Sequence, residues 1–318
     1  METMVELDNL SKHFGPFVAV DGISLKVRKG EVLGFLGPNG AGKSTTMRMV
    51  AGFLTATSGT AKVCGHDVEA EPVLVKSLIG YMAEGSPSYE DMTVRAFLKF
   101  IAEVRGLSGR PAAVRIEEVV SKIKLEAVID RSIEVLSKGY KRRVGMAQAI
   151  LHDPPVLILD EPTDGLDPNQ KHHVRTLIEE MASEKAIIVS THILEEVEAV
   201  CTRAVVIGNG KLLADGTSED LLSILPEHDA IHVVVKPVTV DLAVSKLQTV
   251  PGVSRVTLTQ RADGASQIAC MPREGAEIID GINSVLRDDG ISYSEVYKHR
   301  GDLDAVFRKI TGGGSNNA

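Results

Sequence analysis

The chain has 318 residues, more than one hydrophobic core usually fills, so we expect one large domain and a smaller one. Hydrophobic residues make up 43% of the chain and charged residues 25%, as in an ordinary globular protein. The formal net charge of −8 argues against bulk binding of nucleic acid or of an anionic membrane surface. The three cysteines, Cys64, Cys201 and Cys270, lack the spacing of metal ligands, so we expect reduced thiols in a cytosolic protein.

The sequence also bears on membranes. Its first residues are acidic and lack an apolar core, so we expect no signal peptide. No window approaches the roughly 18 to 20 apolar residues of a membrane span. A role at a membrane would therefore require a partner that holds the chain there.

The first third of the chain is predicted to begin with strands. Alternating runs at 4–10 and 23–27, with a turn at Phe14-Gly15-Pro16, indicate two antiparallel strands. The pattern next predicts a strand over 31–36, a glycine loop over 37–45, a helix from 45 to 54, and strands over 60–63 and 79–82.

The middle of the chain alternates between helices and strands. Apolar residues at Val94, Phe97, Leu98 and Ile101 have helical spacing, and the helical pattern extends from 93 to about 134, with a second run over 111–123. Continuous apolar runs between helices then indicate a parallel sheet covered on both faces. The expected elements are strands over 156–159, 186–189 and 204–207, and helices over 168–183 and 193–201.

The composition changes near residue 220. The pattern that follows is βαββαβ, the order of a ferredoxin-like domain. Its expected elements are strands over 231–236, 253–260, 267–271 and 291–297, helices over 239–250 and 274–287, and a turn at Asp263-Gly264. We expect this domain over 221–311, ending in an amphipathic helix, and a disordered tail over 312–318.

The stretch from Gly37 to Thr45 reads G-P-N-G-A-G-K-S-T and fits G-x-x-x-x-G-K-[ST]. Glycines allow the backbone to curl so that its N–H groups face phosphate oxygens, and the helix N-terminus adds partial positive charge. Lys43 can reach the β- and γ-phosphates of a nucleotide, and the hydroxyl of Ser44 can bind Mg²⁺. The predicted ATP-binding residues are Phe14, Gly37, Pro38, Asn39, Gly40, Ala41, Gly42, Lys43, Ser44 and Thr45.

Two acids end the apolar strand at 156–159. Buried parallel strands carry ligand-binding residues at their carboxyl edge, where the glycine loop is also expected. Asp160 is suited to hold Mg²⁺, directly or through water, and Glu161 to orient and polarise an attacking water.

A third pattern, Leu136-Ser137-Lys138-Gly139-Tyr140, precedes a helix predicted over 144–151. A hydroxyl and a glycine at a helix N-terminus can bind an anion, although the same residues also serve as a plain helix cap.

The order of these motifs, followed by Glu161-Pro162-Thr163-Asp164-Gly165-Leu166-Asp167 and Ser190-Thr191-His192, resembles an ATP-binding cassette (ABC) ATPase over residues 1–220. The resemblance implies a P-loop NTPase fold with a parallel core sheet, an antiparallel β subdomain and a helical subdomain at about 90–150. It also implies that two copies pair head to tail around ATP and Mg²⁺.

The resemblance implies roles for further residues. Ser137, Lys138 and Gly139 would form the signature that meets the ATP of the partner copy. Asp167 would cross the dimer interface, and His192 would contact the γ-phosphate in its own copy. Phe14 would stack on adenine, with Phe17 as the alternative.

Two departures from the common family pattern stand out. The signature reads L-S-K-G-Y instead of L-S-G-G-Q, and Glu84 stands where a glutamine is usual. Glu84 would still supply an oxygen near Mg²⁺ and the water, and it adds a negative charge. Both departures are similar to the branch that pairs with ABC-2-type membrane proteins, and closest to its gliding-motility type.

This resemblance implies an integral membrane permease of ABC-2 type as partner, a second cassette that is most simply an identical chain, and no nucleic acid. The chain would then lie at the cytoplasmic face of the inner (plasma) membrane, held there by the permease, and would drive export. The permease would dock in the cleft near 84–100 and on the helices of 93–134. Met82, Met92 and Phe97 would supply apolar contact there or belong to the core.

Other functions remain open at this point. The chain could be an ABC ATPase without transport, although it shows neither heptads nor a second glycine loop. Its C-terminal domain could bind a small ligand and set the ATPase rate. A GTPase is disfavoured because no N-K-x-D motif is present.

Overall fold

The computed structural model describes residues 2–85, 89–225, 227–236, 239–261, 264–273, 275–299 and 301–312. The chain divides into two compact units, Met1–Ser218 and Glu219–Ala318. Each unit contains its own sheet and its own buried cluster of apolar side chains.

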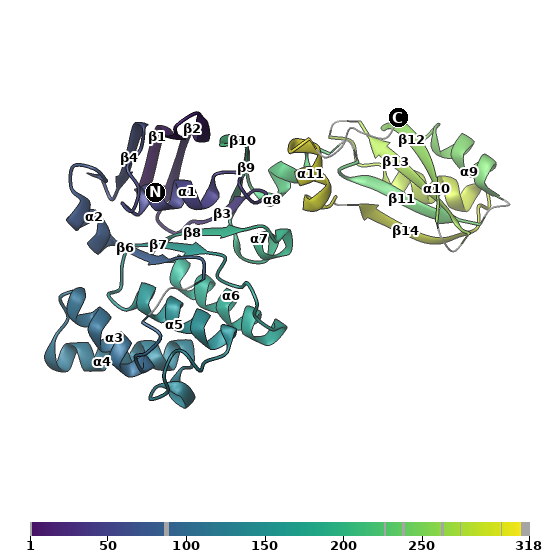
Figure 1. Ribbon diagram of the computed structural model, residues 1–318. Coiled ribbons are helices and arrows are strands. Elements are labelled where there is room, and N and C mark those ends of the chain that lie inside the picture. The colour runs from purple at the N-terminus through teal and green to yellow at the C-terminus, as the bar shows by residue number, and fades with distance from the viewer. Residues whose placement is uncertain are drawn as a thin grey trace. The chain divides into compact units, whose positions relative to one another are not determined.

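A six-stranded sheet forms the centre of the first unit (Figure 1), in the order β10-β9-β3-β8-β7-β6. Neighbours from β9 to β6 are parallel, and only β10 is antiparallel to its neighbour within this sheet. The strands are β3 (Val32–Leu36), β6 (Ile79–Met82), β7 (Val156–Asp160), β8 (Ala186–Thr191), β9 (Arg203–Gly208) and β10 (Lys211–Gly216). Every residue of β3, β7 and β8 is buried, which confirms the predicted parallel sheet with two covered faces.

Alternate residues of the central strands face two separate cores. Leu157 and Leu159 belong to a cluster with the helices of residues 94–182, whereas Val156 and Ile158 belong to a cluster with the strands near the N-terminus. The period of two along each strand divides the side chains between the two faces in this way.

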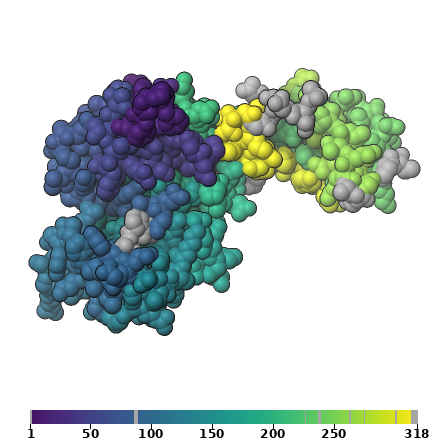
Figure 2. Space-filling view, viewed as in Figure 1, coloured from purple at the N-terminus to yellow at the C-terminus, as the bar shows by residue number. Residues whose placement is uncertain are grey.

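A second, antiparallel sheet in the order β2-β1-β4-β5 covers one face. Its strands are β1 (Thr3–Phe14), β2 (Phe17–Arg28), β4 (Ser58–Val63) and β5 (His66–Asp67). The predicted hairpin and its turn are confirmed, and both strands extend beyond the predicted ends because the residues there still pair across the ladder, as Lys12 does with Val20 and Phe14 with Phe17. Figure 2 shows the purple β1–β2 region above the blue and teal helices of the same unit.

Helices cover the other face and flank the sheet. They are α1 (Lys43–Val50), α2 (Pro72–Leu78), α3 (Val94–Val104), α4 (Gly109–Ile123), the 3₁₀ turn η1 (Glu126–Val128), α5 (Lys138–Ile150), α6 (Pro168–Ala182) and α7 (Leu194–Val200). In Figure 1, α3, α4 and α5 lie together on the side of the sheet opposite β1 and β2.

The predicted helical pattern to residue 134 is wrong at its end. Lys124 adopts φ +59° at the end of α4, and after η1 the chain turns back along the start of α3. There the amide of Ile133 donates to the carbonyl of Met92, and the amide of Val94 donates to the carbonyl of Arg131. These backbone bonds take the place of helical ones.

The second unit has a four-stranded antiparallel sheet in the order β12-β13-β11-β14. Its elements are β11 (Ala230–Val235), α9 (Val240–Leu247), β12 (Val253–Gln260), β13 (Ser266–Pro272), α10 (Ile279–Asp288), β14 (Tyr293–His299) and α11 (Leu303–Ile310), and α8 (Ser218–Leu222) spans the boundary. The element order and strand order are those of a ferredoxin-like domain, as predicted.

Some predictions in this unit need correction or cannot be compared. The helix predicted from Glu274 begins only at Ile279, after Gly275 has adopted φ +74° in the left-handed region. Asp263 of the predicted turn, Glu274 itself and residues 313–318 of the predicted tail lie outside the described residues.

Candidate functional site

The glycine loop connects β3 to α1, which is the strand–loop–helix context that the sequence predicts. Gly40 and Gly42 adopt φ values of +80° and +106°, a region that favours glycine. A Cβ at Gly37 would lie 2.5 Å from the carbonyl oxygen of Ile207. A Cβ at Gly42 would lie 2.5 Å from the carbonyl oxygen of Ala19, so the neighbouring backbone leaves room for glycine alone.

Lys43 is the first residue of α1, and its side chain is buried. Its ammonium group donates to the carbonyl oxygen of Gly37 at 2.6 Å and to that of Pro38 at 3.2 Å. Gly42 is the N-cap of α1, and among the described residues no side chain caps this end of the helix. The first N–H groups of α1 therefore remain available to an anion.

The charges around Lys43 show which acids lie near it. Burial lowers the pKa of the Lys43 ammonium, and the nearby carboxylates of Glu161, Asp160 and Glu84 oppose that decrease. A cation surrounded by three acids in a partly dry site is typical of a place that binds a polyanion together with a metal ion.

The other loop residues differ in exposure. Pro38, Asn39 and Gly40 are exposed at the tip, Ala41 is buried, and Ser44 and Thr45 are half-buried at the start of α1. The exposed tip and the half-buried hydroxyls belong to one continuous segment, as expected for a loop that wraps around a ligand.

Asp160 ends β7 and is 1% exposed. One carboxylate oxygen accepts a hydrogen bond from the hydroxyl of Ser190, which is the residue opposite it in the β7–β8 register. The other oxygen, Oδ2, is buried and has no partner among the described residues. Ser190 was not predicted to take part, although its position two residues before His192 at a strand end could have suggested it.

Glu161 follows directly and adopts φ +51°, an uncommon conformation for a residue with a side chain. Its amide donates to the carbonyl oxygen of Ser190 at 3.1 Å. Its Oε1 lies 2.9 Å from Nδ1 of His192, which is half-exposed. Its Oε2 is buried without a partner among the described residues.

These residues meet because they follow parallel strands at the same edge of the sheet. The glycine loop follows β3, Asp160 ends β7 and Glu161 follows it, His192 follows β8, and Glu84 follows β6. Glu84 is exposed, and its charge still acts on Lys43. The arrangement therefore brings the predicted phosphate loop and the predicted acids together.

Phe14 and Phe17 lie opposite each other at the tip of the β1–β2 hairpin. Phe14 is 49% exposed and Phe17 is 60% exposed, so both rings offer a face to a planar ligand. The ammonium of Lys12 lies 5.3 Å from the centre of the Phe14 ring.

The signature residues form a second group at the starts of α5 and α6. The hydroxyl of Ser137 caps α5 by accepting from the amide of Tyr140 at 3.4 Å. Gly139 is buried, and a Cβ there would collide with the side-chain amide of Gln170. Asp167 is exposed and caps α6 by accepting from the amide of Gln170 at 2.9 Å. Lys138 is exposed and extends towards Asp164.

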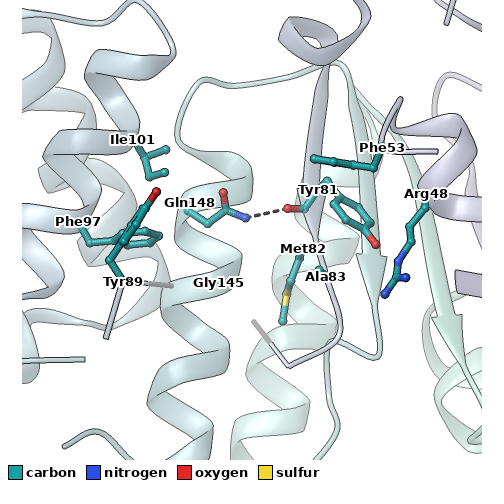
Figure 3. A pocket seen from close by; sticks show the side chains of 10 residues that line it. All are labelled: Arg48, Phe53, Tyr81, Met82, Ala83, Tyr89, Phe97, Ile101, Gly145 and Gln148. Atoms are coloured by element: carbon teal, nitrogen blue, oxygen red, sulfur yellow. Dashed lines mark hydrogen bonds between the residues drawn. The ribbon is translucent and has the colours of Figure 1, made fainter. Parts of the chain in front are cut away.

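A hollow of about 710 Å³ lies between β6, α1, α3 and α5. It is lined by Arg48, Phe53, Tyr81, Met82, Ala83, Tyr89, Phe97, Ile101, Gly145 and Gln148 (Figure 3). The amide of Gln148 donates to the carbonyl oxygen of Tyr81 at 2.7 Å, which ties α5 to β6 along its floor. Met82 and Phe97 are 1% and 3% exposed, so they belong mainly to the core, whereas the rings of Phe53 and Tyr89 are mostly exposed.

Across the described residues, no group of three or more His, Cys, Asp or Glu side chains is arranged to hold a metal ion by itself. Mg²⁺ needs no such cage, because it is usually bound by one or two carboxylates together with phosphate oxygens. The buried oxygens of Asp160 and Glu161 that lack a partner among the described residues fit that donor set.

None of the helices in the described ranges has the length and apolar composition of a membrane span.

Comparison with known proteins identifies relatives for most of the chain. Residues 20–164 match the family model described as ABC transporter. The Nod factor export ATP-binding protein I of Ralstonia nicotianae is 30% identical over 97% of this chain and 94% of its own length. The linearmycin resistance ATP-binding protein LnrL of Bacillus subtilis is 36% identical over 73% of this chain and 75% of its own length.

Another relative is much longer. The probable multidrug ABC transporter ATP-binding protein YbhF of Escherichia coli is 38% identical over 69% of this chain, and the match spans 38% of that protein. Among solved structures, an ATP-binding subunit of an ABC transporter has a TM-score of 0.65 and 30% identity over 70% of this chain and 92% of its own. The ADP- and phosphate-bound dimer of the cassette MJ0796 has a TM-score of 0.63 at 22% identity over 67% of this chain and 98% of its own, a likeness of fold.

The strand–loop–helix at Lys43, the acids beside it and these relatives lead to one conclusion: the chain belongs to the ABC transporter ATP-binding protein family.

Proposed function

We propose that this chain is the ATP-hydrolysing subunit of an ABC exporter. The observation that carries the proposal is a pair of buried oxygens, one on Asp160 and one on Glu161, that have no partner among the described residues and whose carboxylate charges act on Lys43. A carboxylate is rarely buried with a free oxygen unless a ligand or a metal ion completes its bonding. ATP with Mg²⁺ would supply both.

The hydroxyl of Ser44 and the carboxylate of Asp160 would hold Mg²⁺, with Glu84 near enough to contribute an oxygen or to bind through water. When bound, Mg²⁺ neutralises charge on the β- and γ-phosphates. Lys43 and the N–H groups of the glycine loop would bind the same phosphates. The bond between Ser190 and Asp160 leaves Oδ2 as the free oxygen.

Glu161 would act as the base that orients and polarises the attacking water. Its Oε1 is occupied by His192, which fixes the plane of the carboxylate, and its Oε2 is free to accept from water. The other ring nitrogen of His192 would contact the γ-phosphate of the same copy. Hydrolysis then depends on positioning, as in other phosphoryl transfers.

Two copies would close on ATP, with Ser137, Lys138 and Gly139 of one copy against the nucleotide of the other and Asp167 across the interface. The γ-phosphate would link the copies, and its loss would let them separate. The dimeric relative with ADP and phosphate supports this assignment by likeness of fold.

The partner would be an integral membrane permease of ABC-2 type, with the chain held at the cytoplasmic face of the membrane. The hollow beside Met82 and Ala83 is suited to receive a short helix of that permease, because exposed aromatic rings flank it. The names of the relatives, which refer to Nod factor export, multidrug transport and linearmycin resistance, support export as the direction.

The first test is co-purification of a tagged Glu161→Gln chain from detergent-solubilised membranes in the presence of ATP. We expect a membrane protein with several spans to be recovered in stoichiometric amount and identified by mass spectrometry. The matched control is Lys43→Ala in the same background, which should recover less of the ATP-dependent complex.

Recovery of a homodimer alone, under conditions where ATP binds, would contradict the exporter assignment. It would favour an ABC ATPase without transport, whose second unit recruits or regulates a soluble partner.

A further inference from the structure

Two cations at the start of α5 share one acid. The ammonium of Lys138 lies 2.8 Å from Oδ2 of Asp164, and Nη2 of Arg142 lies 3.3 Å from the same oxygen. The Lys138 side chain is 63% exposed and that of Arg142 is 4% exposed. Asp164 therefore has one surface partner and one buried partner, both from the helix that begins with the signature.

Asp164 is in turn bonded to the residue that carries the proposed base. Its amide donates to the carbonyl oxygen of Glu161 at 3.2 Å and closes the turn that follows β7. The carboxylate of Glu161 is in turn hydrogen-bonded to Nδ1 of His192. These hydrogen bonds, joined through the covalent atoms of Asp164 and Glu161, connect the start of α5 with the proposed γ-phosphate contact.

Glu161 needs such support because of its backbone. A residue with a side chain stays at φ +51° only when its surroundings hold it there, and such residues gather at functional sites. Glu161 is the first residue of the turn over 161–164, and the side chain of Asp164 bonds this turn to Lys138 and Arg142 of α5.

The alkyl chain of Lys138 also packs on the next residue of the turn. Gly165 has φ +70°, and a Cβ there would lie 2.6 to 2.8 Å from Cδ, Cε and Nζ of Lys138. The lysine therefore lies directly over the backbone of the turn as well as pairing with Asp164. A displacement of the Lys138 side chain would therefore disturb both its ion pair with Asp164 and its packing on Gly165.

The charge on Asp164 is secure at neutral pH. The hydrogen bond from Lys138 and then the one from Arg142 hold the pKa of Asp164 below its ordinary value. The acid therefore remains an acceptor for both cations across the physiological range.

We propose that Lys138 and Arg142 are positioning residues for ATP hydrolysis: through Asp164 they hold the turn that places Glu161. The inference rests on the proposed function, because it assigns Glu161 as the base. Since Lys138 also belongs to the signature, an ATP bound there by the second copy would be linked to the base of this copy.

The test is steady-state ATPase kinetics of Lys138→Gln, Lys138→Arg and a control, Lys141→Gln. Lys141 lies on the same turn of α5 but pairs with Glu90 at 2.8 Å, so its loss removes one cation without touching Asp164. We expect Lys138→Gln to lower kcat about three- to fivefold with KM for ATP unchanged, the upper range for an exposed pair. Lys138→Arg should restore most of the rate, and Lys141→Gln should match the wild type.

A second set of variants keeps the test informative. Arg142→Gln should lower kcat further, about tenfold, provided that its melting temperature shows a folded chain. In an Asp164→Asn background, Lys138→Gln should have no additional effect, because the shared partner is gone. ATP-dependent dimerisation of Glu161→Gln should be the same with and without Arg142→Gln, because Arg142 is buried and lies outside the signature.

An active wild type with an unchanged kcat in Lys138→Gln and in folded Arg142→Gln would overturn the inference and leave the proposed function intact. Loss of ATP-dependent dimerisation with folded Arg142→Gln would also overturn it, because the rate would then fall through failed assembly of the two copies and not through the turn that holds Glu161. A wild type without ATPase activity would overturn both.

Discussion

At the residue scale, the main evidence for what the site binds is that one buried oxygen of Asp160 and one of Glu161 have no partner within the part of the chain that the structure describes. Leaving a buried polar atom without a partner costs about 1–3 kcal/mol, and more for a charged group. Seven other buried side-chain atoms also lack a hydrogen-bond partner among the described residues, but these two belong to consecutive residues at the end of β7, where ATP and Mg²⁺ would supply the missing partners. Bound ATP and Mg²⁺ would remove this cost, so the ligand should also stabilise the fold.

The first prediction concerns Glu161→Gln. The amide keeps the shape of the side chain but is a poor base, so ATP should still bind while kcat falls about 10²- to 10⁴-fold. Lys43→Ala should have the opposite profile, weak ATP binding, because it removes the cation that faces the phosphates. Equilibrium binding of ATP and single-turnover hydrolysis separate the two effects. Substantial turnover by Glu161→Gln would remove its assignment as the base.

The second prediction concerns the effect of His152 on the stability of the fold at acid pH. Its Nε2 lies 3.1 Å from the carbonyl oxygen of Ile79, and its Nδ1 is buried without a partner among the described residues. Burial, followed by the charge of Arg105, lowers the pKa of His152 to about 4 from an ordinary 6.5. Because the unfolded chain takes up the proton first, this group should reduce stability as the pH falls below about 6.5, and the loss should continue to about pH 4.

Urea unfolding at several pH values tests this sign. His152→Gln keeps a donor for Ile79 but cannot take up a proton, so its free energy of unfolding should fall less between pH 7 and pH 5 than that of the wild type. Other titrating groups contribute equally to both chains. Equal slopes would show that His152 does not control this loss.

Sequence patterns identify site residues that belong to a continuous motif, and they miss those that meet only through pairing. The glycine loop and the Asp160–Glu161 pair were found because the spacing itself carries the chemistry. Ser190 was missed because its role depends on the β7–β8 register, which brings it opposite Asp160. Likewise, the sharing of Asp164 by Lys138 and Arg142 follows from the packing of α5 against the turn.

At the element scale, the same distinction holds for helices and strands. The strands β3, β7 and β8 were predictable because they are apolar throughout and buried. The strand β10 was missed, since alternate residues are exposed and it pairs antiparallel at the sheet edge. The short helix α2 was missed as well, because it buries one side chain, Val75, and so has no apolar stripe.

The third prediction concerns the β1–β2 hairpin, whose tip presents Phe14 and Phe17. Stacking of a base on an aromatic ring is worth about 1–3 kcal/mol. We expect Phe14→Ala to weaken ATP binding by this amount and Phe17→Ala to leave it unchanged. Titration of ATP into each variant in the Glu161→Gln background measures binding without turnover. The reverse result would assign the stacking ring to Phe17.

At the scale of the whole molecule, the chain contains two compact units, each with its own core. All the predicted ATP-site residues lie in Met1–Ser218, which has its own cores on both faces of the central sheet. The ferredoxin-like unit has a separate core beneath α9 and α10. Contact with a permease should therefore involve a surface of the first unit that changes when two copies close on ATP.

The hollow beside β6 is the surface best suited to that contact, and Phe53 is its most accessible aromatic ring at 63% exposed. The ring lies 5.3 Å from that of Tyr81 and is flanked by the ammonium of Lys76 at 5.5 Å. Truncating an aromatic anchor of an interface typically costs 2 kcal/mol or more, about 30-fold in affinity. The fourth prediction is that Phe53→Ala loses the membrane partner while ATP binding by the chain persists.

Leu213→Ala provides the matched control, because Leu213 is also an exposed apolar residue, 42% exposed, on β10, outside the hollow and outside the helices of 93–134. Both variants would be made in the Glu161→Gln chain and purified from membranes with ATP. We expect the control to retain the partner and Phe53→Ala to lose it, because only Phe53 lies in the hollow where a permease helix would insert. Equal recovery from both would place the docking surface elsewhere on the first unit.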